Sequence, residues 1–113
     1  MKDKEKWVEV QCEQRGDVWR WPVEPGAPSS TLEGACVGGR EARTRFGTVQ
    51  AYDFILQNGR KVTVFAKGHL NEMIGAVLRA KGEGVVMRIR FLGWTDVGGG
   101  RRKREFSVSY LAE

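Results

Sequence analysis

Apolar and polar residues alternate in several short segments of the chain, and this alternation predicts β-strands. Residues 45–57 (RFGTVQAYDFILQ) and 60–66 (RKVTVFA) flank Asn58-Gly59, a dipeptide typical of two-residue hairpin turns. Residues 84–92 (GVVMRIRFL) and 106–111 (FSVSYL) predict two further strands. Between these pairs, apolar residues recur at helical spacing, which predicts a helix that ends near Gly82. Its apolar positions are Leu70, Met73, Ile74, Val77 and Leu78.

The first part of the chain is less regular. Residues 7–12 (WVEVQC) alternate as a half-buried strand does, and residues 18–23 (VWRWPV) predict a short extended piece that Pro22 places at an edge. Trp19 and Trp21 share a face of that piece, and the alternatives are that they stack on bases or that they pin the piece to the barrel. We expect pinning for at least one of them. Prolines, glycines and serines are frequent after residue 23, so residues 24–44 are expected to form a long loop.

The chain has 113 residues, the size of one domain. The predicted order is all-β with one helix, which lies between the third and fourth of five strands. This is the order of the OB-fold, a five-stranded Greek-key barrel. An SH3-like barrel is the alternative, but it has shorter strands and usually lacks a helix of three turns in this position.

The two faces of the predicted hairpin differ in character, because side chains alternate strictly along a strand. A two-residue turn gives one small aliphatic face, comprising Val49, Ala51, Ile55, Val62, Val64 and Ala66. We assign this face to the core. Tyr52, Phe54 and Phe65 then point outward as a platform on which bases stack, with Lys61 beside them for phosphates. Asp53 favours the opposite assignment, with the aromatic side chains in the core, because a carboxylate is better placed outside.

The fourth predicted strand shows a similar division. Its odd-numbered positions from Val85 to Phe91 are all apolar and are expected in the core. Arg88 and Arg90 therefore point outward, and continued alternation places Trp94 on the same side. Outward arginines suit phosphate binding, although charges on a solvated edge strand also prevent aggregation.

Positive charge is concentrated near the end of the chain. The whole chain carries a net charge of +5, from 19 Lys and Arg against 14 Asp and Glu. Residues 93–104 (GWTDVGGGRRKR) are expected to form a flexible basic loop, with Arg101, Arg102, Lys103 and Arg104 in succession. Four consecutive cations repel one another, so a polyanion is the expected partner. The alternatives are a solvated turn or a localisation signal. Arg45, before the long strand, is expected on the opposite wall of a groove.

Other chemistry finds little support in the sequence. There is no phosphate-binding glycine motif, no paired set of catalytic carboxylates and no Cys/His spacing of a zinc site. Cys12 and Cys36 are expected as free thiols, and His69, the only histidine, as a surface residue or local cap. No secretion signal or membrane span is predicted. We therefore expect a cytoplasmic protein (in the host cytoplasm if viral) that is not an enzyme and has no metal or cofactor.

The segment MRIRFLGWTDVGGGRRKREFSV, together with the element order over residues 45–111, resembles the small OB-fold single-stranded DNA-binding proteins of bacteriophages and related replicons. In that family a strand of the form V-x-I-x-(F/Y)-x-G runs into a basic loop, as Met87 to Gly93 do here. Bacterial housekeeping members usually end in an acidic tail that recruits partners; residues 110–113 do not resemble such a tail, so recruitment by a tail is not expected here.

The resemblance implies binding of single-stranded DNA with little sequence preference, in replication, recombination or repair. The expected binding residues are Arg45, Tyr52, Phe54, Lys61, Phe65, Arg88, Arg90, Trp94, Arg101, Arg102, Lys103 and Arg104. An RNA ligand and a protein-interaction adaptor are the alternatives. A homodimer or a higher oligomer also stays open.

Overall fold

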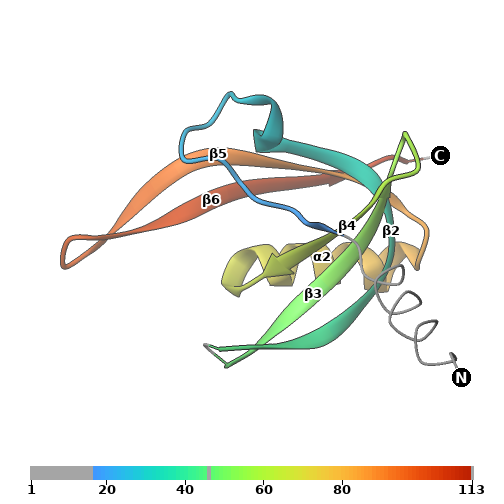
Figure 1. The fold of residues 1–113 in the computed structure, drawn as a ribbon, viewed down its shortest axis with the longest axis horizontal. Helices are drawn as coiled ribbons and strands as arrows, with labels where there is room; N and C mark the ends of the chain where they lie inside the picture. Colours follow the sequence, from blue (N-terminus) through green and yellow to red (C-terminus); the bar gives the residue numbers. More distant parts are fainter. Residues whose placement is uncertain (1–16, 46, 113) are drawn as a thin grey trace, which may run out of the picture.

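The computed structural model describes residues 17–45 and 47–112, in which one helix packs against a strongly bent sheet (Figure 1). Its elements are β1 (Asp17–Val18), the 3₁₀ helix η1 (Pro28–Ser30), β2 (Thr31–Thr44), β3 (Gly47–Leu56), β4 (Lys61–Ala66), α2 (Gly68–Lys81), β5 (Val86–Gly98) and β6 (Arg101–Tyr110). The strand order is β1-β4-β3-β2-β5-β6, and β4 and β6 are not paired within the described residues. The protein is thus mostly β with one helix, as predicted, but its sheet has six strands and is unclosed. The strand predicted at residues 7–12, and Cys12, lie outside the described residues.

The longest strand of the sheet, β2, occupies most of the segment predicted as a loop, so the prediction is wrong for residues 31–44 and is confirmed only for the turns of residues 24–27 before η1. Leu32, Gly34 and Cys36 are buried at alternating positions of β2. Glycine and cysteine, however, are weak predictors of a strand. The first residues of β2 pair with β5, and residues from Gly34 onward pair with β3. Gly34 lies where β2 pairs with both neighbours. A Cβ at this position would lie 2.7 Å from the Ile55 carbonyl oxygen, so the position requires glycine.

The turn between β3 and β4 differs from the prediction by one residue. The Leu56 N–H donates to the Arg60 carbonyl, and the Gly59 N–H donates to the Leu56 carbonyl, so three residues form the loop. Gly59 takes the positive φ of 87° that such a loop needs. Tyr52 consequently pairs with Val64, and Phe54 with Val62. A shift of one residue in register moves the side chains of one strand relative to its partner. Val49, Ala51, Val62, Val64 and Ala66 are buried as predicted, but the predicted positions of Tyr52, Phe54 and Ile55 on β3 are wrong.

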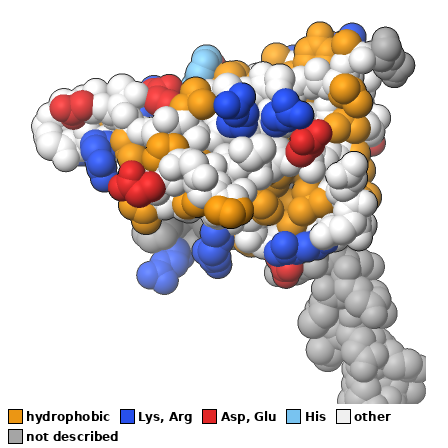
Figure 2. Space-filling model, turned by 90° about the horizontal axis from the view of Figure 1, so that it is seen from above, with side chains coloured by type: hydrophobic (Ala, Val, Ile, Leu, Met, Phe, Trp, Pro, Cys, Tyr) orange, Lys and Arg blue, Asp and Glu red, His pale blue; other side chains and the backbone are white. Residues whose placement is uncertain are grey.

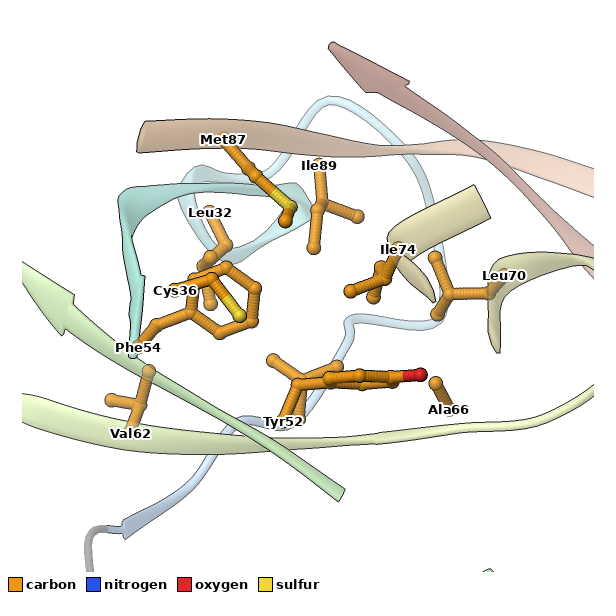
Figure 3. Close-up of a cluster of buried hydrophobic side chains, with 11 residues drawn as sticks. Leu32, Cys36, Tyr52, Phe54, Val62, Ala66, Leu70, Ile74, Met87 and Ile89 are labelled. Carbon is orange, nitrogen blue, oxygen red and sulfur yellow. The ribbon is translucent and has the colours of Figure 1, made fainter. Parts of the chain in front are cut away.

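The aromatic side chains of β3 lie in the core. Phe54 is completely buried and Tyr52 is 6 % exposed, and both point into the cluster that includes Leu70 and Ile74 of α2 (Figure 3). The Tyr52 hydroxyl donates to the Asn71 side chain at 2.5 Å. Burial raises the pKa of Tyr52. Ile55, assigned to the core from the sequence, is instead exposed, and Phe65 is 40 % exposed as predicted.

The helix prediction is confirmed. The helix begins at Gly68 and ends at Lys81, and Gly82 follows with a φ of 86° and donates its N–H to the Leu78 carbonyl. Leu70 and Ile74 are buried, while the other predicted apolar positions pack more loosely against the same cluster. Amphipathic spacing is sufficient here because the helix buries only one stripe.

The expected flexible loop at 93–104 is an ordered β-ribbon, because β5 extends to Gly98 and β6 begins at Arg101. Gly99 and Gly100 make a two-residue turn, with φ values of 63° and 74° that favour glycine. Met87, Ile89 and Phe91 are buried, and Arg88 and Arg90 are exposed, as predicted. A register shift then falls between Phe91 and Gly93, which leaves Leu92 as an extra residue.

This bulge reverses the alternation beyond it, so the expected position of Trp94 beside Arg88 and Arg90 is wrong. Trp94 pairs with Arg104 across the ribbon and lies on the side of Phe91, with ring centroids 5.8 Å apart. The sequence does not predict this bulge, because an apolar residue such as Leu92 between Phe91 and Gly93 also fits an uninterrupted strand. In the structure the Leu92 side chain is exposed.

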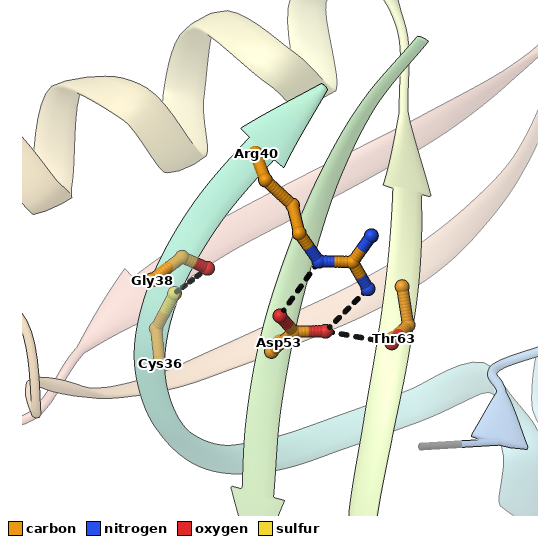
Figure 4. A network of polar contacts seen from close by, with 5 residues as sticks. All are labelled: Cys36, Gly38, Arg40, Asp53 and Thr63. Atoms are coloured by element: carbon orange, nitrogen blue, oxygen red, sulfur yellow. Dashed lines mark hydrogen bonds and ion pairs between the residues drawn. The ribbon is translucent and has the colours of Figure 1, made fainter. Parts of the chain in front are cut away.

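Asp53 lies on the outer face of the sheet, which resolves its poor fit to the predicted core. Its carboxylate accepts two hydrogen bonds from Arg40, at 3.1 and 3.2 Å, and one from the Thr63 hydroxyl at 2.7 Å (Figure 4). Burial alone would raise the pKa of Asp53. The hydrogen bonds from Arg40 and Thr63, together with the charges of Arg40 and Lys61, lower it overall.

We expect Asp53→Asn to reduce the free energy of unfolding by about 1 kcal/mol near neutral pH. Because the pKa of Asp53 is lower in the folded state, its contribution is complete above the usual aspartate pKa of about 4 and is lost as the pH falls through the folded value. Urea unfolding of the wild type and the variant at about pH 7 and about pH 2 measures this difference. The two proteins should converge in acid, whereas Glu41→Gln, on an exposed β2 position, should track the wild type throughout. An equal gap at both pH values would contradict this assignment.

Candidate nucleic-acid interface

A groove of about 860 Å³ opens where the sheet is unclosed. One wall is the turn between β2 and β3, with Arg45 and Thr48, and the other is the ribbon of β5 and β6, from Trp94 to Phe106. Between them lies the junction of β4 and α2, with Phe65 and Lys67. In Figure 1 the two hairpins extend to the left on either side of the start of α2. The groove thus joins segments that are far apart in the sequence.

The groove is strongly basic. Its described lining has five cations against the single carboxylate of Glu105. The cations are Arg45, Lys67, Arg102, Lys103 and Arg104. Lys103 lies 3.9 Å from Glu105, but neither Arg102 nor Arg104 has a carboxylate within 4.0 Å among the described residues. Two guanidinium groups of the groove therefore form no ion pair with a described carboxylate.

Aromatic rings line the same groove. Phe65 is 40 % exposed at the end of β4. Trp21 packs on Phe106 with centroids 4.9 Å apart, and Trp94 lies further along the ribbon. Cations and aromatic rings in one groove are the combination that binds single-stranded nucleic acid, since phosphates bind to the former and bases stack on the latter.

Residues 19–23, which we call the strap, hold the ribbon in place. The Trp94 indole N–H donates to the Val23 carbonyl at 2.8 Å, and the Arg104 guanidinium donates to the Pro22 carbonyl. Trp19 and Trp21 meet edge to face, with centroids 6.0 Å apart, and both pack against the core. The predicted pinning role of the tryptophans agrees with these contacts. The Trp19 indole nitrogen is buried and has no hydrogen-bond partner in the described structure.

The structure brings half of the predicted binding residues together. The groove is lined by Arg45, Phe65, Trp94, Arg102, Lys103 and Arg104. Tyr52 and Phe54 are in the core, so their predicted contact with a ligand is wrong in this structure. Exposed positions outside the groove are occupied by Lys61, Arg88, Arg90 and Arg101. Arg88 forms a 3.5 Å ion pair with Glu33.

Sequence reasoning missed several lining residues. Lys67 directly follows β4 and lines the groove. It could have been found from the sequence as a cation that follows a strand with an aromatic residue on its predicted outer face. Phe106 and Trp21 belong to segments that are distant in sequence, and only tertiary packing brings them to one groove. His69 also lines it and lies 3.4 Å from Glu72, in agreement with the predicted surface position.

Other features of the described residues carry less chemistry. Cys36 is a free, fully buried thiol, as predicted, and burial raises its pKa. No group of three or more His, Cys, Asp or Glu side chains within residues 17–45 and 47–112 is arranged to hold a metal ion. None of the helices in that part of the chain has the length and apolar character needed to span a membrane.

Cations are also present elsewhere on the surface. Seen from above, Lys and Arg side chains are interspersed with hydrophobic and acidic ones (Figure 2). The distinguishing feature of the groove is therefore the scarcity of acidic side chains among its cations and rings, rather than positive charge as such. Comparison with protein-family models, with curated proteins and with solved structures finds no match to this chain.

Proposed function

We propose that the groove binds single-stranded DNA with little sequence preference. The observation that carries this proposal is the set of five cations and several aromatic rings between two hairpins, opposed by a single carboxylate. Flexible single strands expose both phosphates and base faces, whereas a duplex buries its bases in the stack. Among nucleic acids, a ring such as Phe65 can stack only on a base that is itself unstacked.

We further propose that the sheet is an open form of the OB-fold. The support is that β2 pairs with both β3 and β5, and that the only α-helix of the described residues follows β4. OB-folds bind oligonucleotides with the loops that correspond here to the β2–β3 and β5–β6 turns. The groove lies between these two hairpins.

In the proposed mechanism, phosphate oxygens accept hydrogen bonds from the groove cations, and a base stacks on Phe65. Contacts of this kind do not distinguish one base from another, because every nucleotide has a phosphate and every base has a flat face. Such binding suits the protection of single strands during replication, recombination or repair.

Binding should weaken steeply with salt, since each phosphate contact releases counterions. If all five groove cations contact phosphates, the slope of log K against log salt should be about −3.5, or about −0.7 for each contact. A titration with oligo-dT, followed by tryptophan emission at several salt concentrations, measures this slope. A flat slope would rule out the proposed electrostatic mechanism.

Competition experiments separate this proposal from its alternatives. Matched DNA and RNA oligonucleotides of one sequence distinguish a DNA ligand from an RNA ligand, and a duplex of the same length tests the requirement for unstacked bases. Saturation by duplex and single strand at equal concentrations would contradict the role given to Phe65. A protein-interaction adaptor should bind none of the three with the predicted salt slope.

A further inference from the structure

Trp94 is engaged both at its indole N–H and over its ring. Its indole N–H is engaged with the Val23 carbonyl of the strap. Two guanidinium carbons, those of Arg102 and Arg104, each lie 4.5 Å from the centroid of its ring. A base could stack on a ring face that a guanidinium covers only after displacing that guanidinium.

The two arginines on the ring are held differently. Arg104 is half-buried, lies 4.8 Å from the Phe91 ring centroid and donates to the Pro22 carbonyl. Arg102 is exposed, and the Trp94 ring is its one contact shown among the described residues. Among hydrogen bonds, ion pairs and ring contacts of the described residues, the one that orients the Arg102 side chain is thus the contact with the Trp94 ring; Asp96, its cross-strand partner, forms no ion pair with it.

A guanidinium that stacks on an aromatic ring keeps its N–H groups available around its own plane, where they match the oxygens of a phosphate. Arg102 and Arg104 share one side of β6, about 6–7 Å apart along the strand. Because both lie over one ring, their guanidinium carbons are no more than twice 4.5 Å apart. The ring therefore arranges two cations for the phosphates of one strand.

We propose that Trp94 is a positioning residue that holds Arg102 as a phosphate-binding group and does not itself stack on a base. This inference rests on the proposed function and makes it more specific. It assigns phosphate contact to the ribbon and base stacking to Phe65, across the groove. It also gives the strap a role, since Val23 fixes the edge of the Trp94 ring on which the arrangement depends.

A double-mutant cycle tests the proposal. Trp94→Leu and Arg102→Ala should each weaken binding of oligo-dT about tenfold and reduce the magnitude of the salt slope by about 0.7, because both lose the same phosphate contact. The double variant should be no weaker than the weaker single variant. Trp94→Phe keeps a ring for the guanidinium but loses the N–H that bonds to Val23, so its affinity should lie between those of the wild type and Trp94→Leu. Arg101→Ala, a matched loss of charge at the neighbouring position outside the groove, should change binding little.

A strand without bases provides the decisive readout. Trp94→Leu should weaken binding of an abasic phosphodiester strand of the same length by the same factor as it weakens binding of oligo-dT. Loss on oligo-dT alone, or additive effects in the cycle, would show that Trp94 contacts a base and would overturn this inference while leaving the proposed function intact. If the wild type bound neither strand, the proposed function would fail and this inference with it. Circular dichroism and thermal unfolding of each variant separate loss of binding from loss of fold.

Discussion

Phe54→Ala is expected to reduce the free energy of unfolding by about 3–5 kcal/mol, a large part of the stability of a typical domain. Phe54 is completely buried in the core cluster near Leu32 and Cys36, so its removal leaves a cavity as well as lost apolar burial (Figure 3). Urea unfolding of the variant, followed by circular dichroism, measures the effect. Should the variant fail to fold, Phe54→Leu, which keeps most of the volume, still reports a smaller loss of the same kind.

Phe65 is the matched control, because the sequence analysis assigned it to the same face as Phe54. Its side chain is 40 % exposed, so Phe65→Ala should change the free energy of unfolding by less than about 1 kcal/mol. It should instead weaken oligo-dT binding by about 1–3 kcal/mol, the usual value for stacking of one base. A similar loss of stability in both variants would show that the register of β3 and β4 is not the one described.

This pair shows where sequence reasoning succeeded and where it did not. The pattern of residues 45–66 correctly predicts a hairpin, and it correctly predicts that its faces differ. The number of loop residues decides which face is buried, and Asn58-Gly59 fits both a two-residue and a three-residue loop. Asp53 favoured the assignment that the structure shows, with the aromatic residues of β3 in the core. Its carboxylate lies on the outer face, where Arg40 donates a hydrogen bond to it.

The strands of the candidate site show a related limit. Local spacing predicts α2 well, since a single amphipathic stripe defines it. The side on which Trp94 lies depends on a bulge at Leu92, which only the pairing of β5 with β6 reveals. Strand β2 was missed because its glycines lower its strand propensity. The packing nevertheless requires glycine at Gly34, where β2 pairs with both β3 and β5. Long-range pairing, which no local pattern contains, therefore sets the geometry of the groove.

The position of the charge, rather than its total, is expected to decide binding. Lys67→Glu combined with Arg102→Glu reverses one charge at the β4–α2 junction and one on the ribbon. Loss of two charge-assisted contacts and the added repulsion of phosphate should weaken oligo-dT binding about 100-fold or more at low salt. Fluorescence titration at low ionic strength measures this loss, and circular dichroism checks that the fold is retained.

Arg88→Glu combined with Arg90→Glu is the matched control for total charge. Each replacement changes the charge by two units, so either double variant takes the net charge of the chain from +5 to +1. Arg88 and Arg90 are exposed on β5 but do not line the groove, so we expect this variant to lose only the weak, long-range part of the attraction. Equal losses in the two double variants would mean that single strands follow the face of β5 that carries these arginines, as alternation along the sequence suggested. A much larger loss in the groove variant would show that the bulge and the ribbon, which together turn Arg102 toward Trp94, create the binding site.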